Sequence, residues 1–251
     1  MPAPREFLAG RNAVREALVA RRRRIYRVLL AEGLATREIL DEITRLCSTA
    51  GIPQTLMPRA SLDALSAGVR HQGVLAEVAP YPYSSLTEIL ERAQTAQQLA
   101  FILVLDNLQD PQNVGSLLRS AEATGVHGVV VHAQQAVGIT PAVSRASVGA
   151  VEHLHISAET NLAQTLRWLK GQGVWIVGVE EDARAEDYRS LSYDMPLALV
   201  VGSEGAGLRR LTLELCDFVV RIPMLGQIHS LNAAIASSLV LYQAASARGA
   251  L

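Results

Sequence analysis

The stretch FILVLDNLQDPQNVGSLLRSAEATG, residues 101–125, places an apolar run, a polar loop and a helical pattern in direct succession. The apolar run, residues 101–105, predicts a buried strand, and the residues after the loop predict a helix that opens with Asn113. The N-terminus of such a helix presents unpaired N–H groups and a positive dipole end, which both attract anions. Arg119 points back toward that terminus, as helical side chains do. A helix cap and a solvated arginine would explain the same residues, so this stretch alone leaves its function open.

Apolar runs of the same kind recur along the rest of the chain, with helical stretches between them. Short continuous apolar strands that alternate with helices predict a parallel sheet covered on both faces. Ligands of such sheets bind beyond the carboxyl ends of the strands. The further runs occupy residues 126–131, 174–179, 197–201 and 218–222.

The beginning of the chain predicts a separate and smaller α/β unit. Expected helices cover residues 10–20 and 36–50 with a short one capped by Ser61, and expected strands cover residues 25–30, 52–57 and 73–79. A proline-punctuated segment follows, in which Ser85 and Glu88 have the spacing of a capping box. We therefore expect a first domain over residues 1–79, a linker over residues 80–98 and a second domain over residues 99–251.

The composition predicts a soluble, cytoplasmic globular protein. Of the 251 residues, 49% are hydrophobic and 19% are charged, and no apolar run has membrane-spanning length or the form of a signal peptide. The two cysteines, Cys47 and Cys216, lie far apart, which favours a reducing compartment. The six histidines form no ligand cluster, so we expect no metal, and a metal-dependent hydrolase is disfavoured.

The net charge of −1 conceals a basic first domain. Residues 1–80 carry 12 arginines against 8 acidic residues, and many of these arginines are clustered before residue 28. A localised basic surface favours phosphate-rich partners, although a solvated helix end is the alternative explanation. The residues expected to contact such a partner are Arg11, Asn12, Arg21, Arg22, Arg23 and Arg24.

Two further polar segments follow predicted strands. LALVVGSEGAGLRR, residues 197–210, holds Glu204 among three glycines, which allow the backbone to approach a ligand closely. RIPMLGQIHSLNAAIASSLVLYQAA, residues 221–245, predicts a helix capped by Ser230. That helix is so apolar that it is expected to pack on another surface, and a subunit interface is one interpretation. Its stripe consists of Leu231, Ile235, Leu239 and Tyr242.

Together the three segments resemble the ordered motifs of the SpoU-type (TrmH-type) RNA 2′-O-ribose methyltransferases of the SPOUT superfamily. The matching patterns are N-x-G-x-x-x-R at 113–119, G-x-E-G-x-G at 202–207, and I-P-M-x-G at 222–226 followed by S-L-N at 230–232. The first domain is similar to the substrate-binding extension of this family, with GRNAVREAL at 10–18 and HQGV at 71–74. The resemblance covers nearly the whole chain and is closest to the members that methylate a guanosine ribose in large-subunit ribosomal RNA.

The resemblance implies S-adenosylmethionine as the methyl donor, RNA as the substrate, a homodimer, and a trefoil knot in the C-terminal part of the parallel-sheet domain. It leaves open whether Arg119 accepts the hydroxyl proton or holds an RNA phosphate, because arginine normally stays charged. The residues implied for catalysis are Asn113, Arg119, Glu204, Ser230 and Asn232. Those implied for the methyl donor are Gly178, Gly202, Ile222, Met224 and Leu231.

Two alternatives to methylation of ribosomal RNA follow from the same residues. One is methylation of transfer RNA, which the first domain disfavours without excluding it. The other is a catalytically silent RNA-binding dimer, which would have no need for the polar set of Asn113, Arg119, Glu204, Ser230 and Asn232.

Overall fold

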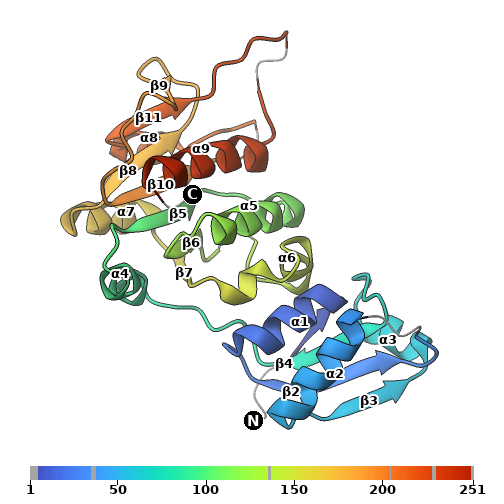
Figure 1. Ribbon diagram of the computed structural model, residues 1–251. Coiled ribbons are helices and arrows are strands. Elements are labelled where there is room, and N and C mark those ends of the chain that lie inside the picture. Colours follow the sequence, from blue (N-terminus) through green and yellow to red (C-terminus); the bar gives the residue numbers. More distant parts are fainter. Residues whose placement is uncertain (1–4, 35–37, 135–136, 204, 228–229, 250–251) are drawn as a thin grey trace. The chain divides into compact units, whose positions relative to one another are not determined.

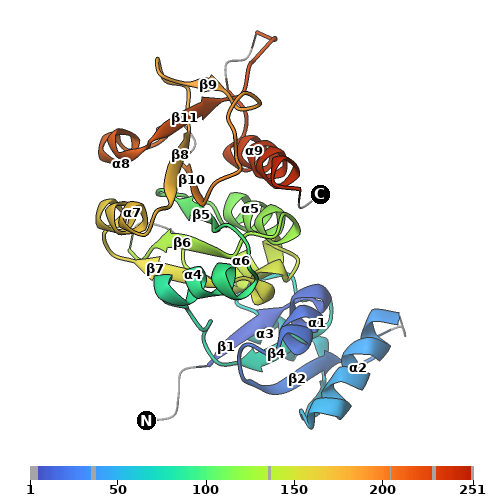
Figure 2. The same ribbon diagram turned by 60° about the vertical axis from the view of Figure 1, so that its left-hand side comes forward.

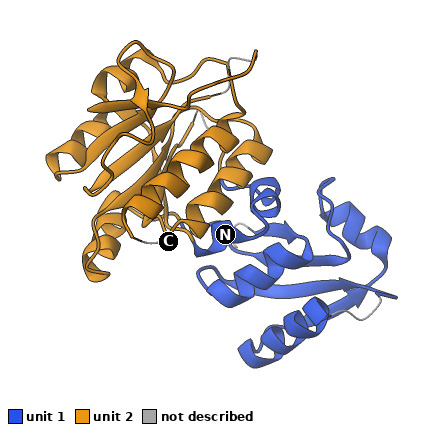
Figure 3. Cartoon of the chain, turned by 45° about the horizontal axis from the view of Figure 1, so that its top comes forward, with its two compact units in different colours: residues 1–82, 139–153 blue, residues 83–138, 154–251 orange. Residues whose placement is uncertain are grey.

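The computed structural model describes residues 5–34, 38–134, 137–203, 205–227 and 230–249, and the chain divides into two compact units (Figure 3). Unit 1 comprises Met1–Pro82 and Ile139–His153, and unit 2 comprises Tyr83–Gly138 and Leu154–Leu251. The first boundary lies near the predicted one. The assignment of Ile139–His153 to unit 1 differs from the prediction, which placed these residues in the second domain.

Unit 1 is built on a four-stranded sheet in the order β1-β4-β2-β3, in which only β2 and β3 run parallel (Figure 1). The predicted strand at 73–79 lies inside this sheet as β4, because the unpredicted strand β1 forms its edge. Ser61 lies within α3 and does not cap it. The elements are β1 (Glu6–Ala9), α1 (Arg11–Ala20), β2 (Ile25–Ala31), α2 (Glu38–Ala50), β3 (Gln54–Met57), α3 (Arg59–Leu65), β4 (Val74–Val78), α6 (Pro141–Ala146) and the 3-10 helix η1 (Ala150–His153).

Apolar side chains cover both faces of the unit 1 sheet, but unequally. Helices α1 and α2 contribute Val14, Leu18 and Ile43 to a cluster with Val74 and other residues on one face. On the opposite face, a smaller cluster gathers around Leu62 of α3. Successive side chains of β4 point to opposite faces of the sheet, as they do in any β-strand.

A buried ion pair holds Ile139–His153 within unit 1. The Arg23 guanidinium donates to both carboxylate oxygens of Glu152, and the two side chains are only 1% and 2% exposed. His153 also pairs with Glu16 of α1, at 2.7 Å. Removing one partner of such a buried pair would leave an uncompensated charge, which is strongly destabilising.

Unit 2 is built on a seven-stranded sheet in the order β7-β6-β5-β10-β8-β11-β9, and every strand pair is parallel. Helices α5 and α9 lie side by side on one face, and α7 and α8 lie on the other (Figure 2). The predicted parallel sheet is confirmed. The strands are β5 (Phe101–Leu105), β6 (Gly128–His132), β7 (Ile156–Glu159), β8 (Trp175–Val179), β9 (Glu186–Asp187), β10 (Leu197–Val201) and β11 (Phe218–Arg221). The helices are α4 (Leu86–Thr95), α5 (Pro111–Ala123), α7 (Leu162–Gly171), α8 (Arg210–Leu215) and α9 (Ala233–Ala247).

The starts of three helices show which local predictions succeeded. The capping box of Ser85 and Glu88 is present, but the helix it opens packs on the core of unit 2 and is not a linker. Helix α5 begins at Pro111 with Asp110 as its cap, so its start was predicted too late. Helix α9 is capped by Asn232, two residues after the predicted cap. Among the described residues, no helix is long and apolar enough to cross a membrane.

Candidate active site

A pocket opens at the carboxyl ends of β8, β10 and β11, where the start of α9 closes one side. Four of the five residues predicted to hold the methyl donor line it: Gly202, Ile222, Met224 and Leu231. The fifth, Gly178, is not in the lining, because its Cα faces the core. A Cβ built there would lie 2.8 Å from Cys216 Sγ and 2.9 Å from Leu208 Cδ1.

The glycine-rich loop after β10 folds back on itself at the edge of this pocket. Ser203 and Gly207 exchange two backbone hydrogen bonds of 3.2 and 2.9 Å. A Cβ on Gly202 would lie 2.2 Å from the carbonyl carbon of Gly207, so only glycine permits this approach. The part of the pocket wall that this loop forms is therefore backbone. Glu204, predicted in the catalytic set, lies outside the described residues.

Two carboxylates that the sequence analysis did not single out hold this loop. Glu180 accepts a 2.6 Å hydrogen bond from the backbone N–H of Leu208 and contacts Gly207. Asp106, which is fully buried, accepts bonds from the backbone N–H of Arg209 at 3.1 Å and from its Nε at 2.6 Å. Each carboxylate directly follows a buried strand, which is the pattern that could have identified both.

Asn113 of α5 and Asn232 of α9 meet beside the pocket. Asn232 Oδ1 accepts from the backbone N–H groups of Ala234 and Ile235, so its Nδ2 is the donor. That Nδ2 donates to Asn113 Oδ1 at 2.9 Å. The first and third predicted motifs are thus in direct contact although 119 positions separate the two residues. Since Leu231 lines the pocket, the asparagine pair adjoins it.

The remaining predicted catalytic residues are both exposed. Ser230 lies on the lining of the pocket. Arg119 projects from α5, does not line the pocket, and makes no hydrogen bond or ion pair with another described residue. The structure thus brings Asn113, Asn232 and Ser230 to one place and leaves the Arg119 guanidinium available to a ligand.

The predicted RNA-binding residues in unit 1 have different surroundings. Asn12, Arg21 and Arg24 are exposed. Arg11 Nε donates to the backbone carbonyl of Gln72 at 3.1 Å, which fixes the Arg11 side chain beside the turn at 71–74.

Two arginines of the predicted RNA-binding run are engaged within the protein. Arg22 Nη1 donates to Tyr81 at 3.0 Å. Arg23 is a correction to the prediction: its guanidinium is buried with Glu152, so it cannot reach an RNA phosphate in this structure. Local sequence could not distinguish it from its neighbours, because its partner lies 129 residues away.

No group of three or more His, Cys, Asp or Glu side chains that could hold a metal ion occurs in the part of the chain that the structure describes. The pocket is lined by glycine backbone, by apolar side chains and by charged side chains such as Glu180, and the two asparagine amides adjoin it. This arrangement, at the strand ends of a doubly covered parallel sheet, defines an α/β protein that binds a small organic ligand.

Comparison with known proteins identifies the family. Residues 100–242 match the SpoU rRNA Methylase family, and residues 7–84 match the family described as RNA 2′-O ribose methyltransferase substrate binding. YacO of Bacillus subtilis, assigned to the TrmH family of tRNA/rRNA methyltransferases, is 42% identical over 97% of this chain and 96% of its own length. The chain belongs to the SpoU rRNA methylase family, and its enzyme class is RNA methyltransferase.

Solved structures of related proteins share this fold. The SpoU methyltransferase AviRb of Streptomyces viridochromogenes, in complex with the cofactor AdoMet, superposes with a TM-score of 0.79 at 26% identity, covering 98% of this chain and 92% of that one. A structure described as an RNA 2′-O ribose methyltransferase gives a TM-score of 0.75 at 30% identity, covering 97% and 89%. Both likenesses extend over both units.

Proposed function

We propose that the protein transfers the methyl group of S-adenosylmethionine to the 2′-hydroxyl of a guanosine ribose in large-subunit ribosomal RNA. The observation that carries this proposal is the direct contact of Asn113 with Asn232 beside the glycine-walled pocket. It supports the proposal because the two asparagines, which would face the RNA, adjoin the pocket that the methyl donor would fill.

The residues of the pocket fit S-adenosylmethionine. The close approach of Gly202 to Gly207 leaves backbone groups on the pocket wall, and Ile222, Met224 and Leu231 supply apolar contacts. A few polar groups on a mostly apolar wall are typical of sites for organic cofactors. When bound, the cofactor supplies a methyl group on a positively charged sulfur. Glu180 and Asp106 would support this chemistry indirectly, because they hold the loop that forms part of the pocket wall.

Asn113 and Arg119 would act on the RNA. Asn232 donates to the Asn113 carbonyl oxygen, so the Asn113 amide N–H donors would be offered to a ribose or phosphate oxygen. Arg119 presents an exposed guanidinium, whose donor fork matches a phosphate. A guanidinium stays protonated near neutral pH, so we assign Arg119 to the RNA phosphate and to orientation, which alone accelerates reactions strongly. Ser230 and Asn232 would complete the pocket, and Glu204 would orient an arginine or a group of the substrate.

Ribosomal RNA is favoured over transfer RNA because the solved structures named for transfer RNA match only part of this chain. A structure described as an A. aeolicus TrmH/SpoU tRNA modifying enzyme covers 64% of this chain, and one described by 2-OH methylation of C/U34 on tRNA covers 61%. The present chain adds the substrate-binding unit, and residues 7–84 match its family. A ribosomal RNA substrate implies that the protein works in the cytoplasm.

A homodimer is part of the proposal. The α9 stripe predicted to pack on another surface is exposed, whereas Val240, Leu241 and Ala244 on the same helix are buried. Contiguous exposed apolar residues mark interaction sites, and Arg119 does not line the pocket of its own chain, so a second copy could complete the site. The exposed fractions are 38% for Leu231, 55% for Ile235, 42% for Leu239 and 46% for Tyr242. The trefoil knot of the family is likewise proposed, since the loop after β10 and the segment before α9 surround one pocket.

Methylation mapping tests the substrate. Ribose methylation would be mapped in ribosomal and transfer RNA from cells with and without the gene, and purified protein would be tested on both RNAs with labelled S-adenosylmethionine. We expect one large-subunit site to lose its methyl group in the absence of the gene. Loss confined to transfer RNA would refute the ribosomal substrate. A folded protein that binds RNA but not S-adenosylmethionine would indicate the silent RNA-binding dimer.

A further inference from the structure

An irregularity in β2 turns an aromatic ring of unit 1 toward a group of arginines. The register between β2 and β4 shifts between Ile25 and Arg27, so Tyr26 is the additional residue of a β-bulge. Bulges change the direction of a side chain and occur beside functional sites. The guanidinium carbon of Arg5 lies 4.4 Å from the Tyr26 ring centroid, and that of Arg24 lies 5.0 Å from it. The Tyr26 ring therefore lies against the guanidinium groups of both Arg5 and Arg24.

A single carboxylate on the neighbouring strand holds two arginines in place. Glu77 accepts from Arg5 Nη1 at 2.6 Å and from Arg27 Nε at 2.5 Å, and its own side chain is only 8% exposed. Arg5 and Arg27 remain 50% and 45% exposed. The hydrogen bond from Arg5 lowers the pKa of Glu77, so the carboxylate stays ionised. Glu77 thus holds Arg5 and Arg27 in place while both side chains remain about half exposed to solvent.

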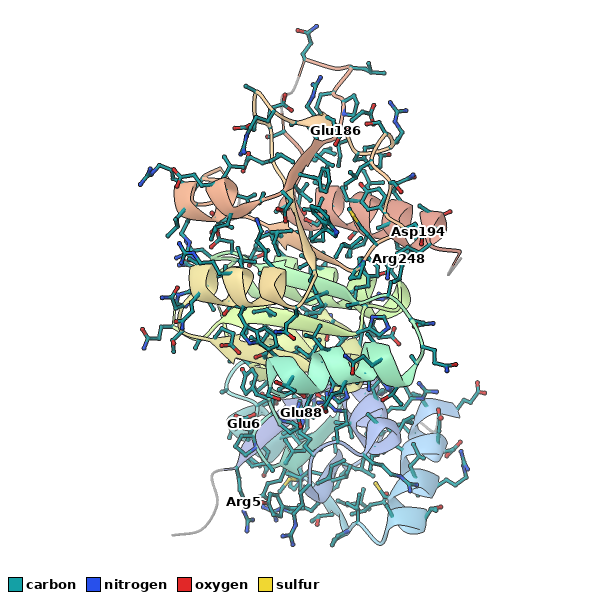
Figure 4. The ribbon with its side chains drawn as sticks, turned by 90° about the vertical axis from the view of Figure 1, so that its left-hand side faces the viewer. Arg5, Glu6, Glu88, Glu186, Asp194 and Arg248 are labelled. Carbon is teal, nitrogen blue, oxygen red and sulfur yellow. The ribbon has the colours of Figure 1, made fainter. Side chains whose placement is uncertain are left out.

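This group lies on the less covered face of the unit 1 sheet. Glu77 is opposite Arg27 on β2, and it alternates with Ala76 and Val78, which belong to the cluster under α1 and α2. Leu75 shares the face of Glu77 and packs against α3. Helix α3 therefore covers one end of this face, and the arginines occupy the other. Figure 4 labels Arg5 near the start of β1.

The charge and geometry of this group favour a polyanion. The group holds three guanidiniums and one carboxylate, of which Arg5 and Arg27 bond Glu77 and Arg24 lies over the Tyr26 ring, so two positive charges are in excess. Each guanidinium has five N–H donors, and in the described residues Arg5 and Arg27 each donate one bond, to Glu77. Planar guanidinium groups that are already oriented suit phosphate, and phosphate contacts position a nucleic acid on its protein.

We propose that Arg5, Arg24, Tyr26, Arg27 and Glu77, which we call the Tyr26 patch, form a binding site for the phosphodiester backbone of RNA. The proposal rests on the proposed function, which supplies RNA as the substrate. It extends RNA recognition to the open sheet face, beyond the residues near Arg11 and the α1 terminus. The patch holds RNA in register and takes no part in methyl transfer.

Salt-dependent binding tests the patch with a charge-matched control. The full-length triple variant Arg5→Gln, Arg27→Gln, Glu77→Gln removes both arginines without leaving the carboxylate buried alone, which would be costly. Its net charge changes by −1, as does that of the control Arg45→Gln, an exposed residue on α2. Binding of a labelled oligouridylate and of a large-subunit ribosomal RNA transcript would be measured over a salt series.

We expect the salt slope for oligouridylate to fall by about 1.4 in the triple variant, since each contact to single-stranded RNA contributes about 0.7. The slope for Arg45→Gln should equal that of the wild type. Arg24→Gln is a second variant, because Arg24 pairs with no carboxylate among the described residues, and its slope should fall by about 0.7. Affinity for S-adenosylmethionine should be unchanged in all three, which shows that unit 2 is intact.

The outcomes separate this proposal from the proposed function. Wild-type slopes in both the triple variant and Arg24→Gln would overturn the patch while leaving methyl transfer in place. A wild-type protein that neither binds RNA nor methylates it would instead overturn the proposed function. Inorganic phosphate at constant ionic strength should not displace the RNA, and full displacement would show a site for free anions and refute the RNA assignment.

Discussion

Replacing Gly202 by alanine should disable the methyl-donor pocket without disturbing the rest of unit 2. A Cβ at this position would lie 2.2 Å from the carbonyl carbon of Gly207, 2.3 Å from its oxygen and 2.5 Å from the nitrogen of Leu208. Ordinary contacts begin at 3.4 Å, so the returning loop must move by about 1 Å. All three atoms belong to the backbone, and no change of rotamer can relieve the overlap.

The expected loss of affinity for S-adenosylmethionine follows from the type of overlap. Forcing extra carbon into a packed site costs about 1–3 kcal/mol, and the displaced segment carries two residues of the pocket wall, Gly205 and Gly207. If this cost falls mainly on the bound state, the affinity for S-adenosylmethionine should drop by about 10-fold to 100-fold. Gly173→Ala, after α7 and away from the pocket, is the matched control. Gly173 has φ +78° with no atom near its Cβ, so the control incurs only backbone strain of about 1–2 kcal/mol.

Isothermal titration with S-adenosylmethionine, together with thermal unfolding, measures both effects. We expect Gly202→Ala to lose most of its affinity and Gly173→Ala to keep the affinity of the wild type. Equal affinities of the two variants, with both proteins folded, would refute the view that the close approach of Gly202 to Gly207 shapes the pocket.

Three further predictions concern residues of unit 2. Arg119→Ala should abolish methyl transfer in a tritium-transfer assay while leaving the affinity for S-adenosylmethionine and the unfolding midpoint unchanged, and near-normal turnover would contradict its role. Arg248→Ala should lower the free energy of unfolding, measured in urea, by about 2–3 kcal/mol, because the Arg248 guanidinium donates to backbone carbonyls that include those of Tyr193 and Met195. Arg248→Lys should keep only part of this stability. Full stability in Arg248→Lys would show that a positive charge alone is sufficient. Burial lowers the pKa of His127 below its unfolded value, so its stabilising effect is complete above about pH 6.5 and is lost as the pH falls. The unfolding midpoint of His127→Gln should therefore depend less on pH between neutrality and mild acid than that of the wild type.

Continuous apolar runs predicted most of the unit 2 sheet, because strands buried on both faces carry an unambiguous local signal. β5 and β10 were predicted at their observed bounds. The edge strand β9 has only two residues, Glu186 and Asp187, and lacks such a signal. Helix starts were harder to predict, since several residues near Pro111 and near Ala233 can cap, and packing decides among them.

The site was predictable in part. Asn113 and Asn232 were predicted from motif order, and the structure brings them into direct contact through the bond from Asn232 Nδ2 to Asn113 Oδ1. Arg23 could not be separated from the arginines beside it, because its burial depends on Glu152 in a distant segment. The same pair explains why Ile139–His153 belongs to unit 1, which no local pattern indicates. A prediction from local sequence therefore misses features that depend on which charged residues pair over long distances in the chain.

Helix α9 links the elements of the proposed site. Its first turn carries Asn232 as cap and Ala233 in the pocket wall, and its middle exposes the apolar stripe proposed to face a second copy. Its end is fixed by Arg248, which lies close to Asp194 (Figure 4). The helix has 15 residues, or about 22 Å at 1.5 Å per residue. Because one rigid element spans donor pocket, asparagine pair and proposed interface, dimerisation would order the pocket and the RNA-facing residues together.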